Sequence, residues 1–145
     1  PVESPAPVPQ PAPRPAGDWR DAPLTAGAWS WANVAGRSTA SFAMAGQPAL
    51  LQLTCLTKGT VQLTHAGTTT SAVPLGVTTS AGTFPLMSDP LVAGASGVTV
   101  TLPAGAPVLD ALAYSRGRFV IEVAGLAPSY LPAWPEVARV VEDCR

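Results

Sequence analysis

The sequence predicts a mainly β protein: a small antiparallel sandwich or partly open barrel, with a C-terminal helix disulfide-linked to a strand. Three observations predict this fold. Short segments in which apolar and polar residues alternate recur between turn residues. The links between these segments are too short for the crossovers that parallel strands need. The last apolar stripe has helical spacing and ends in Cys144, and the only other cysteine, Cys55, lies in a predicted strand.

We expect two parts, a proline-rich linker or strap over residues 1–17 and a single domain over residues 18–145. The whole chain of 145 residues is long enough for one hydrophobic core. Seven of its first 15 residues are proline, which favours an extended polyproline II conformation. Such an arm fits either a semi-rigid spacer or a strap laid across a partner protein. Trp19, the first large apolar side chain, is expected to dock the linker onto the domain.

Alternation predicts eight strands. They span residues 28–34, 38–44, 49–56, 60–65, 72–78, 83–86, 98–102 and 118–123. In the second strand Ala40, Phe42 and Met44 are expected to face the core. Pro74 predicts that the fifth strand lies at a sheet edge, because proline cannot donate a ladder hydrogen bond. The aperiodic loop over residues 88–97 is expected to be mobile or functional.

Two helices are expected. The internal one spans about residues 106–115, with Pro107 suited to its start and Gly117 to its end. The closing one begins near Pro135, and Glu136 complements the positive end of its dipole. Its apolar face consists of side chains at i, i+3, i+4 and i+7, namely Val137, Val140, Val141 and Cys144.

A structural disulfide between Cys55 and Cys144 is the central expectation, with two buried free thiols as the alternative. In a loop-entropy description, closing about 90 residues stabilises the fold by about 4 kcal/mol. A disulfide implies an oxidising compartment, so the chain is expected to be periplasmic or extracellular. Two cysteines and one histidine are too few for a tetrahedral zinc site, and no metal is expected.

The charge content limits the expected partners. Only 12% of the residues are charged, about half of the usual share, so we expect a partner protein to cover part of the surface. The net charge of −1 gives no reason to expect nucleic acid or an anionic membrane as partner. No apolar run reaches the ~20 residues of a membrane-spanning helix. A chain that starts at Pro1 suggests removal of a signal peptide, and a lipid-bearing cysteine upstream is the alternative.

Nothing in the sequence predicts an enzyme. His65, the only histidine, is expected to be a solvated residue at a strand end, although it could in principle serve a Ser–His–Asp triad. No GxSxG elbow, phosphate loop or calcium loop occurs, and no cofactor is expected. Asp89 and Asp110 are the two carboxylates that could meet across a cleft.

Two groups of side chains are candidate binding residues. Trp29 and Trp31 share one strand face, where they form either core or an exposed aromatic platform. Arg116 and Arg118 flank a glycine beside Tyr114 and could bind a carboxylate or phosphate. Alternatively, the two arginines cap the helix end and pair with nearby acids.

The layout of residues 49–145 resembles a group of small exported β-domain proteins of Gram-negative bacteria. An early strand carries Leu53-Thr54-Cys55, further strands follow, and the segment over residues 119–126 precedes a final helix ending in Cys144. These features resemble invasion-associated locus B type proteins and accessory lipoproteins of type VI secretion. The segments Ser115-Arg116-Gly117-Arg118-Phe119 and Leu131-Pro132-Ala133-Trp134-Pro135-Glu136 are also similar to uncharacterised exported proteins of alphaproteobacteria. The resemblance implies an envelope protein that binds other proteins and carries over no catalytic residue.

The expected function is that of a non-enzymatic envelope, periplasmic or secreted accessory protein. It would be a protein-binding or structural subunit tethered through its proline-rich arm. The alternative is a soluble ligand-binding or inhibitor domain that uses the aromatic and arginine side chains named above.

Overall fold

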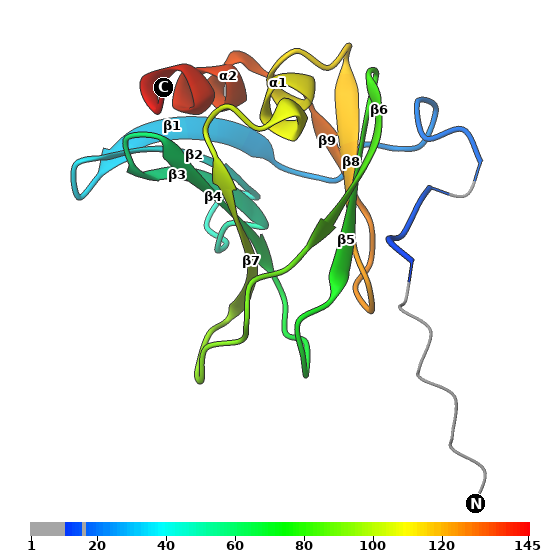
Figure 1. Cartoon of the computed structure of the whole chain (residues 1–145). Helices are drawn as coiled ribbons and strands as arrows, with labels where there is room; N and C mark the ends of the chain where they lie inside the picture. The colour runs from blue at the N-terminus through cyan, green and yellow to red at the C-terminus, as the bar shows by residue number, and fades with distance from the viewer. Residues whose placement is uncertain (1–10, 16) are drawn as a thin grey trace, which may run out of the picture.

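The computed structural model describes residues 11–15 and 17–145, and this part of the chain folds into two antiparallel sheets and two short helices (Figure 1). The mainly β fold is therefore confirmed. The sheets face one another around one hydrophobic core and do not close into a barrel.

The first sheet has five strands in the order β1-β2-β3-β4-β7. Their bounds are Ala28–Val34 for β1, Arg37–Ala43 for β2, Leu51–Thr57 for β3, Thr60–Ala66 for β4 and Gly97–Pro103 for β7. Strands β1 to β4 form the predicted consecutive hairpins. The β1–β2 turn consists of Ala35 and Gly36, whose φ angles of 52° and 80° are those of a two-residue turn that matches strand twist.

The second sheet has four strands in the order β6-β5-β8-β9. They are β5 (Pro74–Thr79), β6 (Gly82–Met87), β8 (Arg118–Val123) and β9 (Ser129–Pro132). The prediction that β5 lies at an edge was wrong, because β5 pairs with both β6 and β8. Pro74 is the first residue of the strand, where a missing N–H is tolerated. The four-residue strand β9 is too short to have been predicted from alternation.

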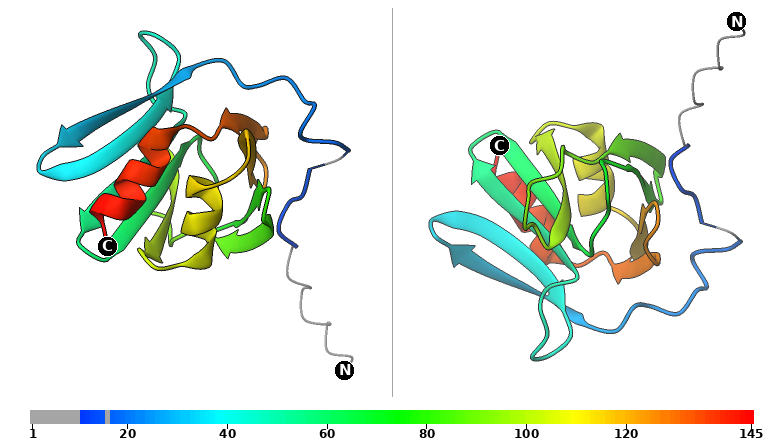
Figure 2. Two further views of the ribbon diagram at one scale, coloured as in Figure 1. Left: turned by 90° about the horizontal axis from the view of Figure 1, so that it is seen from above. Right: turned by 90° about the horizontal axis from the view of Figure 1, so that it is seen from below.

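Both helices lie at one end of the molecule, side by side over the ends of the sheets (Figure 2). Helix α1 (Pro107–Ala113) is three residues shorter than predicted, and helix α2 (Pro135–Asp143) begins where expected. The valines of the predicted apolar face are buried, as is Cys144. Neither helix in the described part of the chain is long and apolar enough to cross a membrane.

Aromatic side chains join the two sheets at the centre of the core. Trp29 of β1 lies 5.5 Å from Phe42 and 6.3 Å from Phe119, measured between ring centroids. Its indole N–H donates a 2.7 Å hydrogen bond to the carbonyl of Pro132 in β9. The expectation that Met44 faces the core was wrong: β2 ends at Ala43, and Met44 is 54% exposed.

The described part of the proline-rich arm lies against the second sheet. A Cβ added to Gly76 of β5 would lie 1.9 Å from the carbonyl oxygen of Pro13, so the arm needs glycine at this position. Beside Gly76, Glu122 of β8 has its Oε1 atom buried without a hydrogen-bond partner in the described chain. Trp19 is buried, as expected for a docked linker. The predictions for residues 1–10 lie outside the described residues, and the domain boundary stays a prediction.

The disulfide between Cys55 and Cys144 is present, with Cα atoms 5.4 Å apart and 89 residues between them in sequence. It joins the end of α2 to β3, as predicted. A 2.6 Å hydrogen bond from the Gly59 amide to the Cys144 carbonyl attaches the same helix end to the β3–β4 turn.

Removing the disulfide should destabilise the fold strongly. We expect the Cys55→Ala/Cys144→Ala protein, and the reduced wild type, to lose about 4 kcal/mol of unfolding free energy, because the unfolded chain regains the entropy of a long loop. Urea unfolding followed by tryptophan fluorescence measures the loss. The reductant should leave the double variant unchanged, and equal midpoints for oxidised and reduced wild type would contradict the prediction.

Candidate binding site

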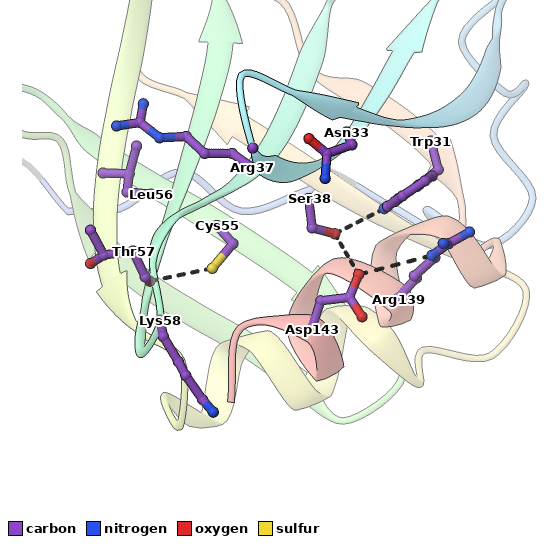
Figure 3. Close-up of a pocket in the computed structure, with 11 residues that line it drawn as sticks. Trp31, Asn33, Arg37, Ser38, Cys55, Leu56, Thr57, Lys58, Arg139 and Asp143 are labelled. Carbon is purple, nitrogen blue, oxygen red and sulfur yellow. Dashed lines mark hydrogen bonds and ion pairs between the residues drawn. The ribbon is translucent and has the colours of Figure 1, made fainter.

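A polar pocket surrounds Trp31, at the end of the first sheet where α2 crosses it (Figure 3). We call it the Trp31 pocket, and its volume is about 490 Å³. Its lining residues come from β1, β2, β3, their turns and α2: Trp31, Asn33, Gly36, Arg37, Ser38, Cys55, Leu56, Thr57, Lys58, Arg139 and Asp143.

Sheet topology explains why distant residues meet in this pocket. In a meander of antiparallel strands, alternate turns lie at the same end of the sheet. The β1–β2 turn brings Arg37 there, and the β3–β4 turn brings Lys58. Helix α2, held by its disulfide, adds Arg139 and Asp143, which are one helical turn apart and therefore share a face.

A short chain of polar contacts fixes the Trp31 ring. Its indole N–H donates a 2.9 Å hydrogen bond to Ser38 Oγ, and Ser38 donates a 2.7 Å hydrogen bond to Asp143 Oδ2. The guanidinium carbon of Arg139 lies 3.3 Å from the ring centroid, and Arg139 Nε is 3.9 Å from the same carboxylate oxygen. The ring is thus held at its edge by Ser38 and at its face by a cation.

The charges around the pocket favour an anion. Three cationic side chains line it, against the single carboxylate of Asp143. Asp143 already neutralises Arg139, whereas Arg37 and Lys58 form no ion pair with any described residue. Figure 3 shows the Arg37 and Lys58 side chains extending in different directions, so each free cation could receive a carboxylate or phosphate group separately.

The two tryptophans predicted to share a face do so, but they differ in burial. Trp29 is only 5% exposed and belongs to the core, so it is not part of a binding surface. Trp31 is half-buried and borders the pocket. The exposed platform of two tryptophans considered from the sequence does not form, and only the Trp31 ring borders a pocket.

The second predicted group does not come together as one site. Arg118 donates a hydrogen bond to the carbonyl of Ala22 in the linker. The amide of Arg116 donates to Ser80 Oγ, and its side chain borders a different pocket. The prediction that the two arginines pair with acids was wrong, since neither is in an ion pair with any residue of the described ranges.

Tyr114 belongs to an exposed network at the end of α2. Its hydroxyl donates a 2.7 Å hydrogen bond to Glu142, and this carboxylate raises the pKa of Tyr114 above its usual value. Arg145 is 2.5 Å from Asp110 and 3.5 Å from Glu142. These contacts tie α1 to the chain terminus and direct Tyr114 away from the arginines.

His65 is buried, so the expectation of a solvated histidine at a strand end was wrong. It is 3% exposed, and its Nδ1 and Nε2 lie 2.7 Å from the Ala66 carbonyl and 2.9 Å from Ser129 Oγ. Since a carbonyl only accepts, Nδ1 carries the proton and Ser129 donates to Nε2. Burial lowers the pKa of His65 below its ordinary value. The contact links β4 to β9 across the core.

Asp89 and Asp110 do not form an acid–base pair. Asp89 accepts hydrogen bonds from the hydroxyls of Thr99 and Thr101, at 3.0 and 2.7 Å, which anchors the loop that precedes β7. Asp110 binds Arg145 instead. Within residues 11–15 and 17–145, no three histidine, cysteine, aspartate or glutamate side chains are grouped as metal ligands.

An apolar hollow lies at the opposite end of the β1–β2 hairpin, with a volume of about 590 Å³. Its lining carries no charge and consists of Thr25, Ala26, Met44, Gln47, Pro48, Ala49, Leu50 and Ala66. The exposure of Met44 leaves a flexible apolar side chain at its rim.

Sequence reasoning missed most of the Trp31 pocket. The missed residues are Asn33, Arg37, Ser38, Lys58, Arg139 and Asp143. A signal existed for two of them, because Arg37 and Lys58 lie at alternate turns of a predicted meander. Arg139 and Asp143 could not be predicted, because the sequence of α2 does not determine how the helix is rotated against the sheet.

Comparisons of this chain with protein-family models, with curated proteins and with solved structures found no match.

The pKa of His65 leads to a prediction about stability and pH. The pKa of His65 in the folded protein lies below 6.5, so the unfolded chain binds more protons than the folded chain as the pH falls through this value. The free energy of unfolding should therefore fall on acidification below about pH 6.5. His65→Gln should remove this component, so the wild-type and variant curves from urea titrations should converge at low pH. Parallel curves would show that His65 is not held neutral. Burial raises the pKa of the Glu122 carboxyl, but this residue is present in both proteins, so its contribution cancels in the comparison.

The hydrogen bonds around Ser38 lead to a second prediction. Ser38→Ala removes the link between the Trp31 indole and Asp143, and should lower the free energy of unfolding by about 1 kcal/mol. Ser30→Ala, at an exposed site on the same hairpin, is the matched control and should be neutral. Equal stabilities of the two variants in urea would contradict a structural role for this contact chain.

Proposed function

We propose that this chain is a non-enzymatic accessory domain of the cell envelope or exterior, which binds another protein or serves as a structural subunit. The single observation that carries the proposal is the Cys55–Cys144 disulfide. Disulfides persist in the periplasm and outside the cell and are rare in the reducing cytosol. This compartment agrees with the exported β-domain proteins that the sequence resembles.

The environment of His65 supports a role other than catalysis. A general base must reach a substrate proton, but both nitrogens of this ring are engaged inside the core. Ser129, the only serine hydroxyl hydrogen-bonded to the ring in the described chain, is itself 2% exposed. The pair therefore acts as a buried tie between sheets.

The surface supports protein binding. Few charges cover it, and Met44, Val34 and Val92 each expose more than half of their side chain. The apolar hollow beside Met44 adds a concave element with no charge to solvate. The proline-rich arm, in this proposal, tethers the domain, either directly or through a lipid-bearing residue upstream of Pro1.

Two measurements on cells that produce the protein test the proposal. Thiol labelling under denaturing conditions should modify no cysteine before reduction and two afterwards, and the protein should leave the cells with the periplasmic or external fraction. A photo-crosslinking residue in place of Met44 should yield one defined adduct, while the same residue in place of buried Leu63 should yield none. Reduced cysteines would refute the compartment, and a free monomer without adduct would refute the accessory role.

Binding of a small anionic ligand in the Trp31 pocket is the second candidate function, favoured by Arg37 and Lys58. We expect phosphate or citrate to shift the NMR signal of the Trp31 indole N–H at low salt. Arg37→Ser/Lys58→Ser should weaken this binding at least tenfold, about 1.4 kcal/mol, because it removes both free cations. Arg116→Ser, which removes a cation from another pocket, is the control. An unchanged dissociation constant in the double variant would exclude the pocket.

A further inference from the structure

Strand β1 is the one sheet edge, among those in residues 11–15 and 17–145, that nothing covers. Two antiparallel sheets have four edge strands, here β1, β7, β6 and β9. An uncovered edge presents unpaired N–H and C=O groups that can pair with another strand. The other three edges are each blocked by a specific device.

The device on β7 is Asp89. Its amide donates a 2.7 Å hydrogen bond to the Thr99 carbonyl, and its carboxylate accepts a 3.2 Å hydrogen bond from the Thr101 amide. The preceding loop therefore occupies the outward backbone groups of this edge.

The edges of the second sheet are blocked in two other ways. On β9, the amide N–H of Thr25 in the linker donates a 2.9 Å hydrogen bond to the Tyr130 carbonyl. The Tyr130 amide in turn donates a 2.9 Å hydrogen bond to Thr25 Oγ1. On β6, Pro85 stands opposite Gly76 in the middle of the strand and has no N–H to offer a neighbour.

Strand β1 has none of these protections. Its sequence, AWSWANV, contains no proline and no charge, and it pairs with β2 over seven consecutive residues without a bulge. It lies at the outer border of its sheet, with the linker leading away from its start (Figure 2). Natural edges of this length usually carry a lysine, proline or bulge.

The register of the hairpin shows which backbone groups are free. In a two-residue hairpin the residues that flank the turn exchange hydrogen bonds, and such pairs alternate along the strands. Val34 and Arg37 flank the turn. Ala32 and Ser30 therefore pair with β2 in the same way. The intervening residues Trp29, Trp31 and Asn33 direct their N–H and C=O groups outwards.

We infer that β1 pairs antiparallel with β1 of a second copy of this chain, about a two-fold axis at Trp31. Trp31 then lies opposite Trp31 of the second copy. Trp29 of each copy lies opposite Asn33 of the other copy. All the outward N–H and C=O groups of these three residues are satisfied in this arrangement. The first sheet becomes one ten-stranded sheet across the dimer, twice its five strands.

The absence of charge on β1 favours a second copy over a different protein. A two-fold axis opposes like groups, so an unpaired charge near its centre would be repelled by its own image. Arg139, which lies over the Trp31 ring, is paired with Asp143 of its own chain. A different partner would be selected by complementary charge, which this strand does not offer. On the face away from the core, the opposed pairs are Ala28 with Val34 and Ser30 with Ala32, all small enough to pack without collision.

The test uses the full, disulfide-bonded chain and needs no ligand. Sedimentation velocity between about 1 and 500 µM should show a monomer–dimer equilibrium in the micromolar range, as expected for a contact of one strand pair. Amide exchange measured by NMR should slow with concentration at Trp29, Trp31 and Asn33, while Ser30 and Ala32 stay protected throughout. A monomer at every concentration overturns the inference, and so does a dimer without this alternating pattern.

Two variants sharpen the test. Asn33→Pro removes an outward N–H at an exposed position, and Ser30→Lys places a charge beside the axis; each should weaken dimerisation at least tenfold. Val92→Lys adds the same charge to an exposed loop residue away from this edge and should leave the monomer–dimer equilibrium unchanged. Equal dimerisation in all three variants overturns the inference. The proposed function is independent of this result, since a monomeric chain could still bind another protein.

Discussion

The attachment of α2 to the first sheet is the constraint on which the rest of this structure depends. A helix of nine residues is too short to be stable alone in water. It persists because three valines are buried against the sheet and because a covalent bond to β3 fixes its last turn. The Gly59 amide adds a hydrogen bond at the same point, so the helix end is held by two independent contacts.

The position of α2 in turn creates the Trp31 pocket. Without the helix, Trp31 would be an exposed ring on an outer strand, and Ser38 would have no carboxylate to bind. With it, Arg139 covers the ring and Asp143 receives the serine hydroxyl. The covalent bond thus shapes the pocket as well as stabilising the fold, because it holds the charges of the helix beside the cations of the turns.

Polar groups inside the core serve the pairing of the sheets. The indole of Trp29 in β1 is hydrogen-bonded to the Pro132 carbonyl in β9, and the ring of His65 in β4 is hydrogen-bonded to Ser129 in β9. Each buried donor or acceptor requires one specific partner, so these contacts fix the position of one sheet against the other in a way that valine and leucine packing does not. The only histidine of the chain therefore has a structural role in the core.

The sequence by itself determined the local and covalent parts of this protein. Alternation and glycine turns located eight of the nine strands in the described chain, helical spacing located the buried face of α2, and two cysteines in predicted elements identified the disulfide. Only the tertiary structure decided which strands became edges, how Pro74 entered a central strand, and that His65 is buried. Those outcomes depend on which elements pack together after the chain has turned back on itself. The Trp31 pocket combines β1, two turns and α2, and no local pattern encodes the angle at which a helix crosses a sheet.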